Sequence, residues 1–300
     1  MSCLEGCYHG WTTGPAEICT FPGDRPVWRE AIAPYVHVAA QPDPFRGAFG
    51  AAAEQYVESV RDAIARSGGA VSFISEPLLG NQGGIVLPHG YLKSVYAAIR
   101  AAGGVCIADE VQVGYGRTGS HLWAFQGEDV VPDIVCVAKA AGNGFPLGGV
   151  ICRRELAEAF SSSGTFFSSA GGSPLSCAIG TTVIDVLVRD ELQANAANIG
   201  SVLRAGIEQI ADHHEQVGAV LGRGLYMGVD LVHDRSSRAP APVEALAVCE
   251  RMRELGVIVQ PTGDRGNVLK LKPPLCISEQ SGHTILDALD RALTDICGTR

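Results

Sequence analysis

Two acidic residues and one lysine, types that could perform amine chemistry, follow two apolar runs of the sequence. Asp109 and Glu110 come directly after the run 105–108, and Lys139 follows the run 134–137 after one intervening alanine. A lysine amine in a protected site can have a lowered pKa and form an imine with a carbonyl group. A carboxylate beside it can keep a pyridine nitrogen protonated, which makes a pyridine cofactor an electron sink. Spacing alone leaves open that Asp109 caps a turn and Lys139 is a surface residue.

The apolar runs that precede these residues are typical of buried strands. Val71–Ser75, Val105–Ala108 and Ile134–Val137 are short and rich in β-branched residues. Residues 90–102 carry apolar side chains at helical spacing and are followed by two glycines, which predicts a helix between the first two strands. Strand, helix and strand in this order predict a parallel sheet, whose ligands bind beyond the carboxyl ends of the strands. We therefore expect the carboxylate and the lysine at the same sheet edge.

The later part of the chain has a different pattern. Pro174–Val188 and Glu191–His213 are predicted as long helices. After them we predict strands at Leu225–Leu231, Gly256–Gln260 and Val268–Lys272, and helices at Val243–Glu254 and Glu279–Ile296. We therefore expect a large α/β domain over residues 1–215 and a smaller α+β domain over residues 216–300.

Composition excludes several classes of function. A net charge of -9 argues against a nucleic-acid partner, because phosphate binding needs clustered Lys and Arg. The ten cysteines form no C-x-x-C pair and the histidines show no ligand spacing, so we expect no metal site. The longest apolar stretch, residues 130–152, is interrupted by Asp133, Lys139 and Pro146, so we expect no membrane span. The first residues show no export signal, and we expect a cytoplasmic protein.

One further motif, Gly114–Gly119, matches the dinucleotide-binding pattern G-x-G-x-x-G. That interpretation requires the first glycine to follow a strand directly and the last to open a helix. Residues 109–113 intervene here, and polar Arg117 and Thr118 fill the turn. The motif therefore gives little support to a nicotinamide site.

Six segments of the chain, in one order, resemble the class III aminotransferases. The stretch Asp109–Gly119 resembles the family signature D-E-V-Q-x-G-[FY]-G-R-T-G. Residues 133–148 resemble the family's lysine segment D-[IL]-x-x-x-x-K-x-[ML]-G-x-G-x-P-[LM]-G. The other four matches are Tyr8-His9-Gly10, Glu76-Pro77 with Gly83-Gly84, residues 169–174 and residues 270–275. Independent chance matches to all of them are rare, so the chain is identified as similar to this family.

The resemblance implies a fold type I enzyme that uses pyridoxal 5'-phosphate (PLP), with a mostly parallel sheet, helices on both faces and a C-terminal α+β domain. It also implies a homodimer with active sites at the interface, which moves an amino group from a small amine or amino acid to a keto acid. Lys139 would hold the cofactor as an imine (aldimine) and then carry the proton of the substrate α-carbon. Asp109 would pair with the pyridine nitrogen, and Gln112 would lie near the ring hydroxyl.

The remaining site residues also follow from the resemblance. Tyr8 would stack on the ring face, with His9 in the same cofactor-binding turn. Ser169 stands where the family usually has Thr, and would offer its hydroxyl to the cofactor phosphate of the neighbouring subunit. Glu76 would lie near the substrate pocket. From the residues alone, Tyr8 could instead be a core aromatic and Glu76 an ordinary strand end.

The chain departs from the family pattern at Lys270, where the family commonly carries an Arg that binds a substrate carboxylate. A lysine cannot make the bidentate contact of an arginine. Residues 267–276 resemble one branch, which includes phospho-lyases acting on phosphoethanolamine and phosphohydroxylysine beside alanine–glyoxylate aminotransferase relatives. A PLP-dependent phospho-lyase is therefore the alternative activity.

A second departure concerns the phosphate-binding loop G-[ST]-x-A-N, which no segment of this sequence matches. Backbone N–H groups at a helix N-terminus normally bind the cofactor phosphate. We therefore expect the N-terminal part of the family fold to be missing and the chain by itself to bind PLP weakly. A truncated fragment with little or no activity, exposing apolar surface and an unpaired sheet edge, is the third possibility.

Overall fold

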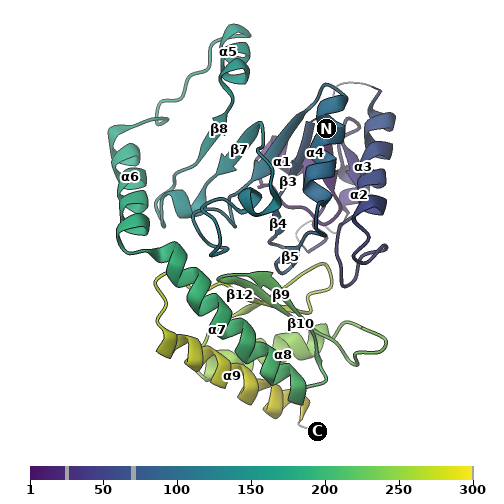
Figure 1. Cartoon of the computed structure of the whole chain (residues 1–300), viewed down its shortest axis with the longest axis vertical. Coiled ribbons are helices and arrows are strands. Elements are labelled where there is room, and N and C mark those ends of the chain that lie inside the picture. Colours follow the sequence, from purple (N-terminus) through teal and green to yellow (C-terminus); the bar gives the residue numbers. More distant parts are fainter. Residues whose placement is uncertain (24–26, 69–71, 299–300) are drawn as a thin grey trace.

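The computed structural model describes residues 1–23, 27–68 and 72–298, and its centre is a six-stranded sheet (Figure 1). The strands lie in the order β2-β1-β3-β6-β7-β8 and are parallel except β8, which is antiparallel to β7. The predicted α/β fold with a mostly parallel sheet is therefore confirmed. The strands are β1 (Ser2–Leu4), β2 (His37–Ala39), β3 (Ser72–Ser75), β6 (Val105–Asp109), β7 (Ile134–Val137) and β8 (Gly149–Cys152).

Two amphipathic helices bury apolar faces against this sheet and form the first hydrophobic core. In α3 (Ala53–Ser67) the buried residues are Tyr56, Val57, Val60 and Ala63, which recur every three or four positions. In α4 (Tyr91–Ala101), the helix predicted from its spacing, buried side chains pack beside Phe73 and Cys106 of the sheet. The same part of the chain contains α1 (Thr13–Ile18), α2 (Trp28–Ala31), the hairpin strands β4 (Leu78–Leu79) and β5 (Ile85–Val86), and the 3-10 helices η1 (Ala124–Glu128) and η2 (Lys139–Ala141).

A second core lies between an antiparallel sheet and three helices, seen in the lower half of Figure 1. The sheet has the order β11-β12-β10-β9, and the helices are α7, α8 and α9. The elements are α7 (Leu192–His213), β9 (Val217–Arg223), β10 (Tyr226–Leu231), α8 (Pro242–Glu254), β11 (Gln260–Thr262), β12 (Val268–Leu271) and α9 (Glu279–Cys297). Residues of α7 from Ala196 to Ile210 belong to this core. The division at residue 215 stays a prediction.

The sequence placed one strand of this second sheet wrongly. We predicted a strand over Gly256–Gln260, whereas β11 begins at Gln260, where it pairs with Lys270 of β12. Gly256 instead forms the left-handed turn that ends α8, with φ at 89°. The strand β9 gave no signal, because its glycines weaken a strand pattern. One of them, Gly222, has φ at 96° and a Cβ there would lie 2.0 Å from the backbone oxygen of Tyr226.

The last part of the large sheet has few packing partners in this chain. All four residues of the edge strand β8 are exposed, and α5 (Arg154–Ser162) buries none of its residues. The helix α6 (Pro174–Arg189) buries only Leu187. Figure 1 shows α5 projecting away from the rest of the molecule. No helix in the described ranges combines the length and hydropathy needed to cross a bilayer.

Candidate active site

The carboxyl ends of β6 and β7 bring Asp109 and the lysine segment to one edge of the sheet. The two strands are parallel, with Asp109 opposite Cys136. The buried Asp109 carboxylate lies 2.7 Å from Nδ1 of His9 and accepts the N–H of Val111 at 3.0 Å. Burial alone lowers the pKa of His9, but the neighbouring Cys7 and the hydrogen bond with Asp109 outweigh it and raise that pKa well above its ordinary value. A protonated His9 therefore supports an anionic carboxylate at this position.

Lys139 opens the short helix η2 and lies on the wall of a cavity. Its φ is 43°, in the left-handed region that residues with a side chain rarely adopt. Strained backbone of this kind concentrates at functional sites, where the surrounding structure holds it in place. The turn that follows needs Gly142, because a Cβ there would lie 2.0 Å from the backbone oxygen of Phe145. Lys139 is exposed in this chain, and its role toward a cofactor stays a prediction.

The cavity has a volume of about 1060 Å³, which is enough for a cofactor together with a small substrate. Its wall combines the loop after β6, the lysine segment, one face of α6 and the segment after β12. Residues with polar side chains on this wall are Gln112, Tyr115, Arg117, Lys139, Asn143, Thr182, Asp190, Lys272 and Cys276. The predicted residues Gln112 and Lys139 are therefore brought together by the fold.

Gln112 is the centre of a hydrogen-bond network beside the cavity. Its Oε1 accepts bonds from Tyr226 Oη and Lys272 Nζ, each at 3.2 Å, and its Nε2 donates to Asn81 Oδ1 at 2.8 Å. Lys272 Nζ also lies 5.1 Å from the centroid of the Tyr226 ring, which is a cation–π distance. Sequence reasoning missed Lys272. The available signal was its position two residues after Lys270, which places both side chains on one side of the extended chain.

Glu76 is buried beside this network. Its Oε2 accepts the N–H of Gly80 at 2.7 Å. Burial and the negative charge of Asp109 raise the pKa of Glu76 to about 8. At neutral pH this carboxyl group is therefore mostly uncharged, in contrast to the hydrogen-bonded carboxylate of Asp109.

Asp109, His9 and Glu76 are not among the residues that line the cavity, and neither are the last three predicted residues. Tyr8 is half-buried, and its ring meets that of Trp11 edge-on with 6.4 Å between centroids. Ser169 is exposed in the segment between α5 and α6. Lys270 lies in β12 opposite Gly228 of β10. Their roles toward a cofactor or substrate stay predictions.

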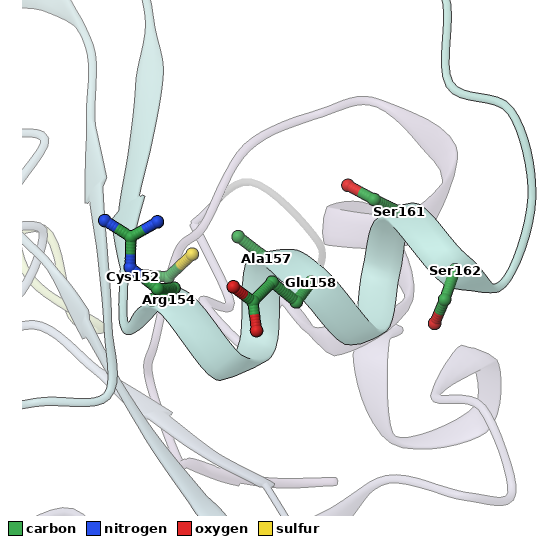
Figure 2. A pocket seen from close by; sticks show the side chains of 6 residues that line it. All are labelled: Cys152, Arg154, Ala157, Glu158, Ser161 and Ser162. Atoms are coloured by element: carbon green, nitrogen blue, oxygen red, sulfur yellow. The ribbon is translucent and has the colours of Figure 1, made fainter.

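A second hollow lies along α5 (Figure 2). Its lining comes only from the end of β8 and from that helix, and the side chains of Arg154, Glu158 and Ser162 do not converge on one point. It offers no arrangement for chemistry. Within the ranges 1–23, 27–68 and 72–298, no group of three or more His, Cys, Asp or Glu residues could hold a metal ion.

The sheet and its helices form the fold of the fold type I aminotransferases. Residues 1–293 match the class III aminotransferase family, and the chain belongs to that family, whose members in general depend on PLP. It is 40% identical to the alanine–glyoxylate aminotransferase 2-like protein of Drosophila melanogaster, over 99% of this chain and 63% of that protein. It is 33% identical to human mitochondrial alanine–glyoxylate aminotransferase 2, over 97% of this chain and 61% of that protein.

Solved structures of two enzyme types resemble this chain. One is a phospholyase from Arthrobacter in complex with phosphoethanolamine, with a TM-score of 0.91 and 36% identity, covering 98% of this chain and 70% of the other. Another is an amine transaminase from an uncultivated Pseudomonas species in its PLP-bound form, with a TM-score of 0.90 and 28% identity, covering 98% and 69%. The chain thus spans about three fifths of the length of the curated relatives it matches.

Proposed function

We propose that this chain carries the catalytic part of a PLP-dependent aminotransferase, which transfers an amino group from a small amine or amino acid to a keto acid. The observation that carries the proposal is that Asp109 and Lys139 follow adjoining strands at one sheet edge, with Lys139 on the wall of a cavity of about 1060 Å³. These residues suit a pyridine cofactor, because the buried Asp109 carboxylate is supported by His9 and the Lys139 amine lies on the wall of the cavity.

Each residue has a role in this proposal. When bound, PLP supplies a carbonyl group for the lysine and an electron-withdrawing ring. Lys139 holds the cofactor and, once substrate displaces its amine, moves the proton at the substrate α-carbon. The pair Asp109–His9 keeps the ring nitrogen protonated, and Gln112 lies near the ring hydroxyl. The roles inferred for Tyr8 at the ring face, Ser169 at the phosphate of a partner subunit, and Glu76 and Lys270 at the substrate are also part of the proposal.

Further parts of the proposal concern the whole protein. We infer a homodimer with active sites at the interface, two domains that meet near residue 215, and a cytoplasmic location. The human and Arabidopsis thaliana relatives are named as mitochondrial proteins, so the location within the cell needs its own measurement.

Reduction with borohydride tests the role of the lysine. The protein incubated with millimolar PLP is expected to show a visible absorption band, and reduction is expected to fix the cofactor to the peptide that contains Lys139. The variant Lys139→Ala should lose both signals, whereas Lys93→Ala, at an exposed position of α4, should keep them. Label on Lys93, Lys270 or Lys272 with Lys139 unmodified would overturn the assignment.

A phospho-lyase is the second candidate function, and the fold match to the Arthrobacter phospholyase at 36% identity favours it. Incubation with phosphoethanolamine separates the two activities. Release of inorganic phosphate and ammonia without a keto acid indicates the lyase. Transfer of nitrogen to an added keto acid without release of phosphate indicates the aminotransferase.

A further inference from the structure

The cavity wall carries a cation that the proposed reaction does not use. Lys272 follows β12 and is half-buried, and its ammonium group has one hydrogen bond to a described residue, Gln112. An ammonium group has three N–H donors, so two donors are left for another acceptor. Among the residues that the structure describes, no carboxylate lies at ion-pair distance from Lys272 Nζ. A half-buried charge without a counter-ion is costly unless a bound anion completes the site.

The surroundings of Lys272 make this part of the cavity electropositive. The positive charge of Lys272 is destabilised by three nearby cations, Arg117, Lys139 and Lys270. The acidic Glu76 has the opposite effect on that charge. Because burial and Asp109 keep the carboxyl group of Glu76 mostly protonated at neutral pH, it neutralises little of this charge. One nitrogen of Arg117, Nη1, is engaged by the backbone, since it donates to the backbone oxygens of Leu225 and Pro273. Lys272 is therefore a positioned cation with two free N–H donors, in a region that attracts anions.

The ammonium group of Lys272 is also held in a defined position. Its contact with Gln112 Oε1 is shared with Tyr226 Oη, and Gln112 is fixed in turn by Asn81. The ring of Tyr226 lies against the ammonium with 5.1 Å between Nζ and the centroid. A charge oriented before the ligand arrives binds an anion without the cost of ordering a flexible side chain.

We propose that Lys272 is a specificity residue that binds a negatively charged group of the amine substrate, a phosphate or a carboxylate, while Lys139 acts on the amine end. The inference rests on the proposed function and names its substrate class as amines that carry an acidic group. It gives the contact with the acidic group to Lys272, two residues after Lys270, the position to which the family resemblance pointed. Lys270 lies opposite Gly228 in the sheet and outside the lining of the cavity.

The test uses ethylphosphonate, a phosphate analogue with no amine to react. Its dissociation constant is measured by calorimetry on the PLP-loaded protein. Lys272→Met removes the charge and keeps the length of the side chain, so the affinity should fall about 10- to 100-fold, the effect of losing hydrogen bonds to a charged group. Lys272→Arg should keep most of the affinity, and Lys93→Met on α4 should behave as the unchanged protein. The PLP absorption band and the melting temperature should stay the same in all variants.

Two comparisons identify the chemistry of the bound group. Propionate measured in parallel with ethylphosphonate distinguishes a carboxylate site from a phosphate site. In kinetics, Lys272→Met should raise KM for phosphoethanolamine or β-alanine with little change in kcat, and should leave propylamine, which has no acidic group, unaffected.

Several outcomes would overturn the proposal. One is that neither anion binds detectably to the unchanged protein. Another is that Lys272→Met binds ethylphosphonate with the same affinity as the unchanged protein. A third is that PLP abolishes ethylphosphonate binding, which would assign the site to the cofactor phosphate. Failure of borohydride to label Lys139 would defeat the proposed function. In that case anion binding to the cofactor-free protein, lost in Lys272→Met and kept in Lys272→Arg, would still assign an anion site to Lys272.

Discussion

Two carboxyl groups near the sheet edge have different surroundings. Asp109 accepts a backbone N–H and pairs with His9, whereas Glu76 is buried and accepts the N–H of Gly80. Such a division lets one site contain a fixed anion and a neutral hydrogen-bonding group at the same pH. The charge of Asp109 is itself one cause of the raised pKa of Glu76.

The raised pKa of Glu76 predicts a pH-dependent stability. The pKa is about 8 in the folded chain, and it is about 4.3 in an unfolded chain. The folded state therefore binds the extra proton between these values, and the free energy of unfolding contributed by Glu76 falls as pH rises through this window. The melting temperature of Glu76→Gln, compared with that of the unchanged protein at the same pH, should therefore increase as the pH rises from about 5.5 to 8.5. The control Glu155→Gln, at an exposed position of α5, should differ in melting temperature from the unchanged protein by the same amount at every pH. The same constant difference for Glu76→Gln would contradict the prediction.

Anion binding at Lys272 should also depend on pH. Burial and the cations Arg117, Lys139 and Lys270 lower the pKa of Lys272 to about 8, while Glu76 opposes this shift. The Lys272 charge is present below that pH and lost above it, so the affinity for propionate, whose own charge is constant in this range, should fall as pH rises through about 8. Glu76 ionises in the same range and would also weaken anion binding. Titration in Glu76→Gln separates the two groups, and an affinity there that stays constant through this range would contradict the role of Lys272.

At the scale of elements, the β4–β5 hairpin sets the position of the network around Gln112. Gly80 lies in this hairpin, and a Cβ there would lie 2.6 Å from both Glu76 Oε2 and Tyr226 Oη. Because both atoms are in hydrogen bonds, Gly80→Ala should displace them and lower the free energy of unfolding by about 1–3 kcal/mol, as overpacking of a tight site does. Gly164→Ala, where no atom lies within 4 Å, is the matched control. Denaturant unfolding of both variants measures the difference, and equal stabilities would show that the network adapts without cost.

Elements with a strong local pattern were predicted well from the sequence. The strand Ile134–Val137 was predicted with its observed bounds, and α4, α6, α7 and α9 differ from prediction by one residue at their ends. These segments combine β-branched runs or helical spacing with clear stop signals. The sequence could not indicate that Lys272 rather than Lys270 reaches the cavity, because two residues that are two positions apart lie on the same side of an extended chain. That choice depends on where β12 ends and on which strand covers each side chain.

At the scale of the whole molecule, the large sheet is covered unevenly. The first strands are buried beneath α3 and α4, whereas β8, α5, α6 and the segment between them present exposed apolar side chains. These are Val150, Ile151, Phe160, Phe166, Phe167, Leu175, Ile184 and Val188. Many exposed apolar side chains beside an unpaired strand edge are typical of an interface or an aggregation site. The solved relatives are longer chains, of which this one covers about 70%.

We therefore expect the 300-residue chain to associate with itself through this surface when it is purified alone. Charged residues on an exposed strand edge oppose pairing with another chain, so Ile151→Lys combined with Phe166→Ser and Phe167→Ser should shift the protein toward monomer. Ile258→Lys is the matched control, because Ile258 is 83% exposed but belongs to the connection before β11, outside this surface. Size-exclusion chromatography with light scattering, over a range of protein concentrations, measures the effect. A monomeric unchanged chain, or an equal shift in Ile258→Lys, would show that the β8–α6 surface does not drive association.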